Sequence, residues 1–147
     1  MASRKILRYG ARAIWDRKTG GRIRLPGLPD LRFDTPARFG GLGRYACADQ
    51  LFLSSLAACL TATFLHFQKK LRFAPVGVEA NVKARLELVE GHGYRFSGIK
   101  AFLLVWSKKA DLAVAQRCAD LAVEYCHLTQ TVANVVPVTV RSHVRAR

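Results

Sequence analysis

The chain has 147 residues, enough for one domain of ordinary size. Half of the residues are hydrophobic and 23% are charged, which fits a packed core and excludes a disordered or fibrous chain. The 24 Lys and Arg residues outnumber the 10 Asp and Glu residues, for a net charge of +14 that attracts polyanions, but no nucleic-acid-binding signature accompanies it.

The first third of the chain, residues 1–34, predicts short β-strands. Apolar and polar residues alternate over 8–16, and a glycine-containing turn at residues 18–21 leads into a second strand at 22–25. A third strand is expected at 31–34. Residues 35–48 follow as a loop rich in glycine.

A long apolar helix is expected over residues 49–70. Asp49 suits its first turn, and Lys69 and Lys70 suit its last turn. The uncharged stretch from Gln50 to Gln68 contains Ser, Thr, His and Gln residues, so we interpret it as a buried core helix rather than a membrane span. With no signal-peptide pattern at the N-terminus, we expect a cytoplasmic protein.

The second half predicts a long hairpin, a helix and a strand. Strict alternation from residue 76 and a return to residue 106 indicate a half-buried hairpin. A second helix is expected at 110–126 and a final strand at 132–140, where Pro137 favours an edge position or a bulge. The fold class is therefore α+β in one domain, 1–147, with an antiparallel sheet and helices on one side.

Four cysteines occur without metal-ligand spacing, so we expect no metal site and reduced thiols. Cys118 and Cys126 lie on the interior side of the second helix, and Cys47 lies in the glycine-rich loop, where partial exposure is expected. Cys59 lies in the apolar helix, where a thiol has a raised pKa and is inert unless a cation reaches it. The turn after the first strand offers Arg17 and, beyond it, Arg22.

These residues carry a resemblance to a known family. The loop at residues 34–41 (DTPARFGG), the segment at 48–51 (ADQL) and the helical segment at 56–60 (LAACL) resemble the OsmC/Ohr (osmotically induced/organic hydroperoxide resistance) family. The family pattern is a T-P-x-x-x-G-G loop, then P-E-x-L, then a helix with its first cysteine. A second family cysteine near the end of the second helix matches Cys126.

The resemblance implies a thiol peroxidase that reduces organic hydroperoxides and forms an intertwined homodimer. Cys59 would be the peroxidatic residue and Cys126 the resolving residue, and the two would form a disulfide. An external dithiol of lipoyl or thioredoxin-like type would reduce this disulfide, and the resemblance implies no bound cofactor. Arg17 would activate the thiolate, with Arg22 as the fallback, and Asp49 would hold the arginine.

The sequence departs from the family pattern at three positions. Asp49 replaces the usual glutamate, Ala48 replaces the preceding proline, and His127 follows Cys126 where proline is frequent. These departures leave open a family member without peroxidase activity that binds a small apolar ligand. The basic charge leaves open a third class, a nucleic-acid or polyphosphate binder.

Overall fold

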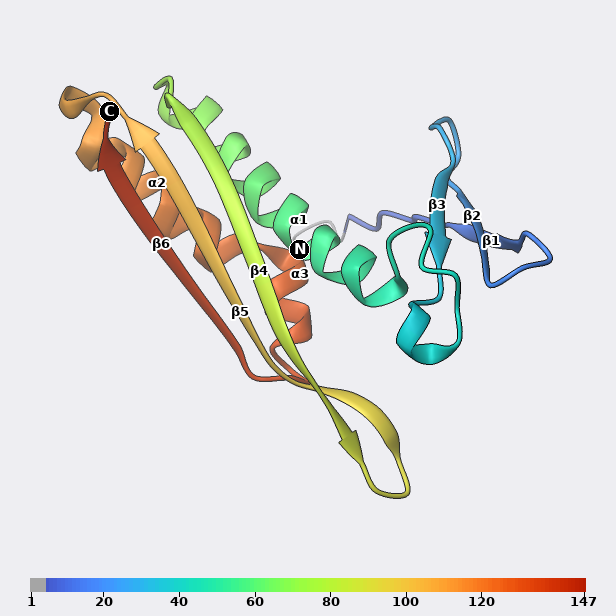
Figure 1. Ribbon diagram of the computed structural model, residues 1–147. Helices are drawn as coiled ribbons and strands as arrows, with labels where there is room; N and C mark the ends of the chain where they lie inside the picture. Colours follow the sequence, from blue (N-terminus) through green and yellow to red (C-terminus); the bar gives the residue numbers. More distant parts are fainter. Residues whose placement is uncertain (1–4) are drawn as a thin grey trace. The chain divides into compact units, whose positions relative to one another are not determined.

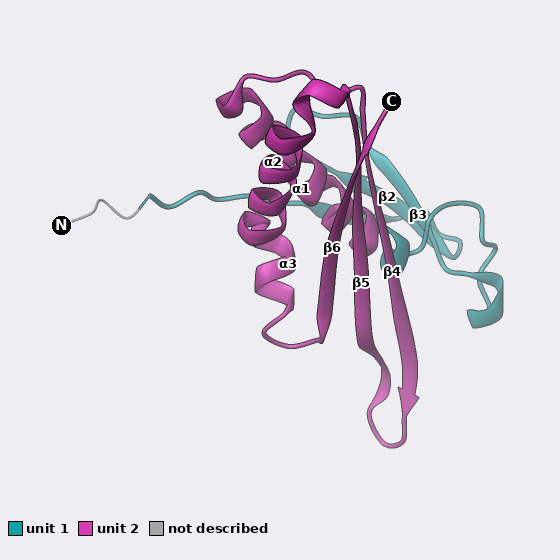
Figure 2. Ribbon diagram, turned by 90° about the vertical axis from the view of Figure 1, so that its left-hand side faces the viewer, with its two compact units in different colours: residues 1–51 teal, residues 52–147 magenta. Residues whose placement is uncertain are grey.

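A computed structural model describes residues 5–147, so residues 1–4, the start of the predicted 1–34 strand region, lie outside the described residues. The contacts divide the chain into two compact units, residues 1–51 and 52–147, which are described separately (Figure 2). Helix α1 (Ala48–Leu71) belongs partly to each unit.

The first unit contains a three-stranded antiparallel sheet in the order β1-β2-β3. Its strands are β1 (Arg12–Trp15), β2 (Gly20–Arg24) and β3 (Leu31–Asp34). The predicted third strand is confirmed to the residue, whereas the first is shorter than the predicted 8–16. Strands β1 and β2 are joined by a tight turn, within which Arg17 has a φ of 65°, in the left-handed region.

The loop after β3 contains a short 3-10 helix, η1 (Ala37–Phe39), followed by the paired glycines. Gly40 has a φ of 80°, and a Cβ on Gly41 would lie 1.9 Å from the carbonyl oxygen of Thr35. The backbone therefore requires glycine at both glycine positions of the T-P-x-x-x-G-G pattern.

The second unit is a three-stranded sheet, in the order β4-β5-β6, with helices on one face (Figures 1 and 2). Strands β4 (Gly77–Val89) and β5 (Gly93–Ser107) form the predicted long antiparallel hairpin. Strand β6 (Val138–Ala146) pairs with β5 in parallel.

Two predictions for this unit are wrong. The final strand lies at 138–146 rather than 132–140, because residues up to Val132 continue a helix and Pro137 precedes the strand. The sheet is mixed rather than antiparallel, because the helices between β5 and β6 return the chain to the end of the sheet at which β5 begins. The predicted edge position is confirmed, since β6 pairs only with β5 among the strands of residues 5–147.

The second helix, predicted at 110–126, is formed by two pieces, and a further helix that was not predicted follows it. A short 3-10 helix, η2 (Lys109–Asp111), leads into α2 (Leu112–Tyr125), and α3 (His127–Val132) follows after a single residue. That residue is Cys126, whose φ of −66° and ψ of 100° are extended. Chain direction therefore changes at the cysteine.

The core of the second unit lies between the sheet and the helices. Helix α1 contains no glycine or proline and buries Leu56, Cys59, Leu60 and Phe64, which follow helical spacing. The buried residues of α2 are small, which lets this helix pack close to its neighbours in the core. They are Ala115, Cys118, Ala119 and Ala122. By length and composition α1 also meets the requirements of a membrane span, but the buried stripe fits the predicted core helix.

Candidate active site

The two predicted thiols lie in the core cluster of the second unit. Cys59 on α1 is 9% exposed, and Cys126 between α2 and α3 is fully buried. Both cysteines belong to the same cluster of buried side chains, and the Cys126 thiol is near enough to raise the pKa of the Cys59 thiol. The structure therefore brings together the two cysteines that were predicted to act as a pair.

The environment of Cys59 holds its proton on the sulfur. Burial raises the pKa of the Cys59 thiol, and the neighbouring thiol of Cys126 acts in the same direction. The backbone N–H of Leu128 and the hydroxyl of Thr63 act in the opposite direction but do not outweigh burial. The net effect is a raised pKa of Cys59, which agrees with the expectation that this thiol needs an activating partner.

One neighbour of Cys59 was not assigned a role from the sequence. The Cys59 Sγ atom lies 3.6 Å from Nδ1 and 3.9 Å from Nε2 of His127, the first residue of α3. His127 itself is exposed. The sequence feature that could have singled out His127 is its departure from the family pattern, which frequently has proline at this position.

Arg17 and Arg22 belong to the first unit. Arg17 is exposed in the β1–β2 turn, and no ion pair involves it among the described residues. Arg22 lies on β2 and pairs with Asp30 at 3.7 Å on the exposed surface. Of the two, Arg17 is thus the cation without an acidic partner in this part of the chain.

Asp49 lies in the first turn of α1, as expected. Within the described part of the first unit, no hydrogen bond or ion pair joins it to Arg17. The roles of Arg17, Arg22 and Asp49 therefore stay predictions.

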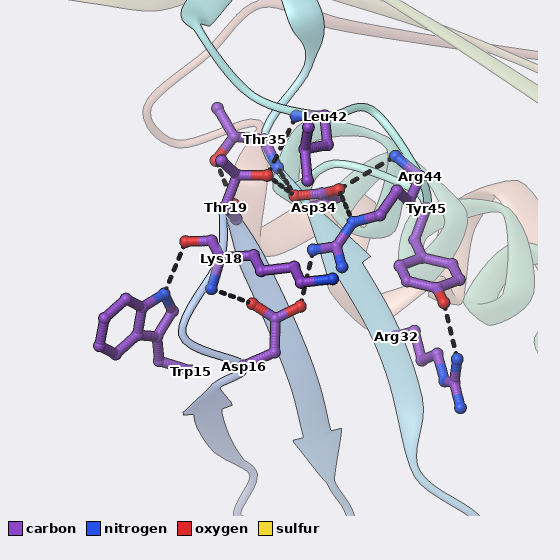
Figure 3. Close-up of polar contacts among 10 residues, drawn as sticks. All are labelled: Trp15, Asp16, Lys18, Thr19, Arg32, Asp34, Thr35, Leu42, Arg44 and Tyr45. Atoms are coloured by element: carbon purple, nitrogen blue, oxygen red, sulfur yellow. Dashed lines mark hydrogen bonds and ion pairs between the residues drawn. The ribbon is translucent and has the colours of Figure 1, made fainter.

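A polar network that the sequence analysis did not anticipate supports the turn that carries Arg17 (Figure 3). Asp34, only 2% exposed, accepts four hydrogen bonds, from the Thr19 hydroxyl, the Thr35 N–H, and the N–H and Nε of Arg44. The Arg44 guanidinium also donates to Asp16 at 2.6 Å, and the Asp16 carboxylate accepts from the Lys18 N–H at 2.8 Å. Both flanks of Arg17 are thus fixed.

The hydrogen bonds and charges of this network favour the ionised forms of Asp34 and Asp16. The Arg44 side chain, with help from Thr19, holds the pKa of Asp34 far below its usual range despite burial. Burial alone would raise the pKa of Asp16, but the Lys18 N–H and Arg44 outweigh it and lower the pKa. Arg44 therefore has a structural role, since its guanidinium is paired with both acids.

The other two cysteines have structural surroundings. Cys118 is fully buried, donates to the Phe64 carbonyl oxygen at 3.3 Å, and has its pKa raised to about 11 by burial. Cys47 is buried rather than partly exposed, and its N–H donates to the Gln50 side chain at 3.0 Å. Gln50 lies in the first turn of α1, so this turn accepts a hydrogen bond from the loop.

Comparison with known proteins identifies the family. The model of the OsmC-like protein family matches residues 41–141. The chain belongs to this family. No curated protein sequence matches the chain at a significant level.

Solved structures of OsmC/Ohr proteins share the fold over nearly the whole chain. An organic hydroperoxide resistance protein OsmC from Legionella pneumophila is 20% identical, with 96% of this chain and 100% of that chain covered and a TM-score of 0.73. An organic hydroperoxide resistance protein from Elizabethkingia anophelis is 16% identical, with 97% and 100% covered and a TM-score of 0.75. An OsmC-like protein of unknown function from Vibrio cholerae is 15% identical, with 95% and 100% covered and a TM-score of 0.72.

Proposed function

We propose that this OsmC-like protein is a thiol-dependent peroxidase that reduces organic hydroperoxides. The observation that carries the proposal is that Cys59 and Cys126, which match the family's paired cysteines, lie in one buried cluster, where the Cys126 thiol acts on the pKa of Cys59. The Cys59 thiolate attacks the terminal oxygen of the hydroperoxide, the O–O bond breaks, and an alcohol leaves once protonated. The resulting sulfenic acid condenses with the Cys126 thiol to release water and form a disulfide.

The surroundings of Cys59 support an apolar substrate. The cluster around the thiol is built from aliphatic and aromatic side chains, including Leu60, Phe64 and Leu128. Such walls favour the alkyl group of an organic hydroperoxide over small, strongly hydrated hydrogen peroxide. A second substrate, an external dithiol of lipoyl or thioredoxin-like type, returns both cysteines to thiols without a bound cofactor.

Arg17 is proposed as the cation that stabilises the Cys59 thiolate, with Arg22 as the fallback and Asp49 as the carboxylate that holds it. The polar network around Asp34 supports this assignment, because it fixes the turn on both sides of Arg17 while Arg44 is already paired with two acids. Arginine retains its charge at all relevant pH values, which suits a thiolate partner.

A cytoplasmic homodimer is the proposed working form. Helix α1 is apolar, yet only four of its 24 residues are buried within the chain. Leu65 on α1 is 46% exposed, and Tyr9 and Trp15 of the first unit are 92% and 68% exposed. Apolar surface of this extent is typical of subunit interfaces. Light scattering should give twice the mass of one chain, and a monomer across micromolar concentrations would contradict the proposal.

Peptide mapping tests the chemistry. After one equivalent of cumene hydroperoxide, the Cys59–Cys126 disulfide should be the main product, and a dithiol should reverse it. Cys59→Ser should abolish peroxide consumption. Cys126→Ser should leave a Cys59 sulfenic acid that dimedone traps. Cys118→Ser is the matched control, since this thiol is buried but outside the pair; disulfides that contain only Cys47 or Cys118 would contradict the proposal.

A second candidate is an OsmC-like dimer that binds a small apolar ligand and has no peroxidase activity. The observation that favours it is the raised pKa of Cys59, which burial would keep protonated in the absence of an effective cation. In that case the wild-type protein would leave cumene hydroperoxide unconsumed while still binding an apolar fluorescent probe.

A further inference from the structure

The imidazole ring of His127 lies against the sulfur of Cys59, although the two residues are 68 positions apart in the sequence. The Sγ atom is 3.6 Å from Nδ1 and 3.9 Å from Nε2, within hydrogen-bond distance for sulfur. An exposed imidazole beside a nearly buried thiol has one side in contact with the nucleophile and the other open to solvent.

The local backbone explains how the ring reaches the sulfur. Helix α2 ends at Cys126, which is extended, and α3 begins directly afterwards. The Gln130 N–H and the Thr129 hydroxyl both donate to the Cys126 carbonyl oxygen at 3.0 Å, so the start of α3 is fixed. His127 is therefore held beside α1 by the same break that positions Cys126.

The thiol has a need that this ring can meet. Burial and the Cys126 thiol both keep the proton on Cys59, and a protonated thiol is a poor nucleophile. Among the described residues of the second unit, His127 contributes the only ionisable nitrogen recorded within hydrogen-bond distance of the sulfur. Imidazole is the side chain most often used to take a proton from a catalytic thiol.

We propose that His127 is a catalytic residue of this site, the base that deprotonates Cys59 and the acid that protonates the leaving alkoxide. The proposal rests on the peroxidase function and deepens it. Imidazole takes the thiol proton and becomes imidazolium; the thiolate then attacks the terminal oxygen of ROOH. The S–O bond forms as the O–O bond breaks, sulfur is oxidised by two electrons, and the imidazolium proton converts RO⁻ to ROH. Histidine thus returns to its neutral form, and the sum is thiol plus ROOH giving sulfenic acid plus ROH.

This assignment gives the departure from the family pattern a function. A proline at position 127 has no side-chain nitrogen to offer the sulfur, whereas the histidine found here does. In this chain the site would contain an internal base from the second unit in addition to the arginine proposed from the first. The two contributions differ chemically, since arginine stabilises the thiolate but does not exchange protons.

Alkylation of Cys59 by iodoacetamide tests the proton-accepting half of the proposal without any peroxide. The variant is His127→Gln, which keeps a hydrogen-bonding side chain but cannot act as a base. At pH 7 its Cys59 alkylation rate, followed by peptide mapping, should fall by about 100-fold, the low end of general-base effects. The matched control is His92→Gln in the exposed β4–β5 turn, which should alkylate like the wild type. Equal rates for His127→Gln and the wild type would overturn the proposal.

Single-turnover reaction with cumene hydroperoxide tests the second half and separates this inference from the proposed function. If the wild type forms the Cys59–Cys126 disulfide and His127→Gln does so equally fast, peroxidase activity stands and the role of His127 is refuted. If the wild type forms no disulfide while His127→Gln still slows alkylation, the peroxidase function fails and only thiol activation survives. Melting temperatures check folding. His127→Asn, with a shorter side chain, is the second variant, and it should show the same loss of alkylation.

Discussion

The two units of the chain are stabilised by different kinds of interaction. Apart from Cys47, every buried hydrophobic residue of the described chain lies in the second unit. The first unit instead surrounds a buried carboxylate, Asp34, with hydrogen bonds from Thr19, Thr35 and Arg44. One unit depends mainly on apolar packing and the other on a satisfied polar network.

This difference explains how the proposed chemistry is divided. An apolar core can bury a thiol and select an apolar substrate, but it keeps that thiol protonated and does not accommodate an unpaired cation. A polar unit can present arginines at low cost, because their charges stay hydrated or paired. The two paired thiols, Cys59 and Cys126, therefore come from the second unit and the proposed arginine from the first, while His127 is exposed beside the core.

The largest effect is expected from removing a core side chain of the second unit. Phe64 is fully buried and contacts Phe73 edge-to-face. Phe64→Ala should destabilise the protein by about 3–5 kcal/mol in urea unfolding, because it leaves a cavity between helix and sheet. Val135→Ala, at a position 82% exposed, is the control and should change stability by less than about 0.5 kcal/mol. Equal effects of the two substitutions would mean that packing does not dominate in this unit.

The next effect concerns the buried carboxylate of the first unit. Asp34→Asn keeps the shape but removes the charge, so Arg44 loses one of its two carboxylate partners. The melting temperature should fall by several degrees, and amide hydrogen exchange should accelerate in β1–β3. The control Asp30→Asn disrupts only long, exposed ion pairs with Arg22 and Arg24, each at 3.7 Å, and should have almost no effect.

The same carboxylate predicts a dependence of stability on pH. Because the pKa of Asp34 is lowered in the folded protein, its contribution is fully present above the unfolded value, about 3.9, and declines as the pH falls below that value toward the folded pKa. The stability difference between the wild type and Asp34→Asn should therefore be constant from pH 7 to about pH 5 and narrow at lower pH. A difference that stays constant down to pH 2 would refute the lowered pKa.

How much of this arrangement could be predicted depends on whether the determining contacts are local. The central helix and the hairpin were predicted closely, because periodicity, end charges and turn residues lie within each segment. The parallel pairing of β6 and the break between helices at Cys126 were not predicted, because each depends on how the second helix packs on the sheet. In the site, the cysteine pair came from a family resemblance, whereas the 3.6 Å contact of His127 with Cys59 depends on that same unpredicted break.

A smaller effect is expected at Arg17. Arg17→Ala should slow peroxide reduction by at least ~10-fold, equivalent to about 1.4 kcal/mol, and raise the pKa of Cys59. Alanine is the suitable variant because it keeps the strain of the left-handed φ of 65°, which glycine would relieve. The double-mutant cycle with Asp49→Asn should be non-additive if the two residues act as one unit. Loss in Arg22→Ala but not in Arg17→Ala would transfer the role to Arg22, and loss in neither would favour the ligand-binding candidate.

The smallest effect is expected at Cys118, which separates burial from reactivity within the same core. Its pKa is raised to about 11 by burial, and the thiol donates to the Phe64 carbonyl oxygen. Native protein at pH 8 should therefore leave Cys118 unmodified by iodoacetamide while Cys59 reacts, since His127 lies beside Cys59 alone of the two. Cys118→Ala should cost only about 1 kcal/mol, because it removes one small group and one weak hydrogen bond and leaves peroxide reduction unchanged. If Cys118 were alkylated as fast as Cys59 in the native state, neither burial nor the histidine would explain which thiol reacts.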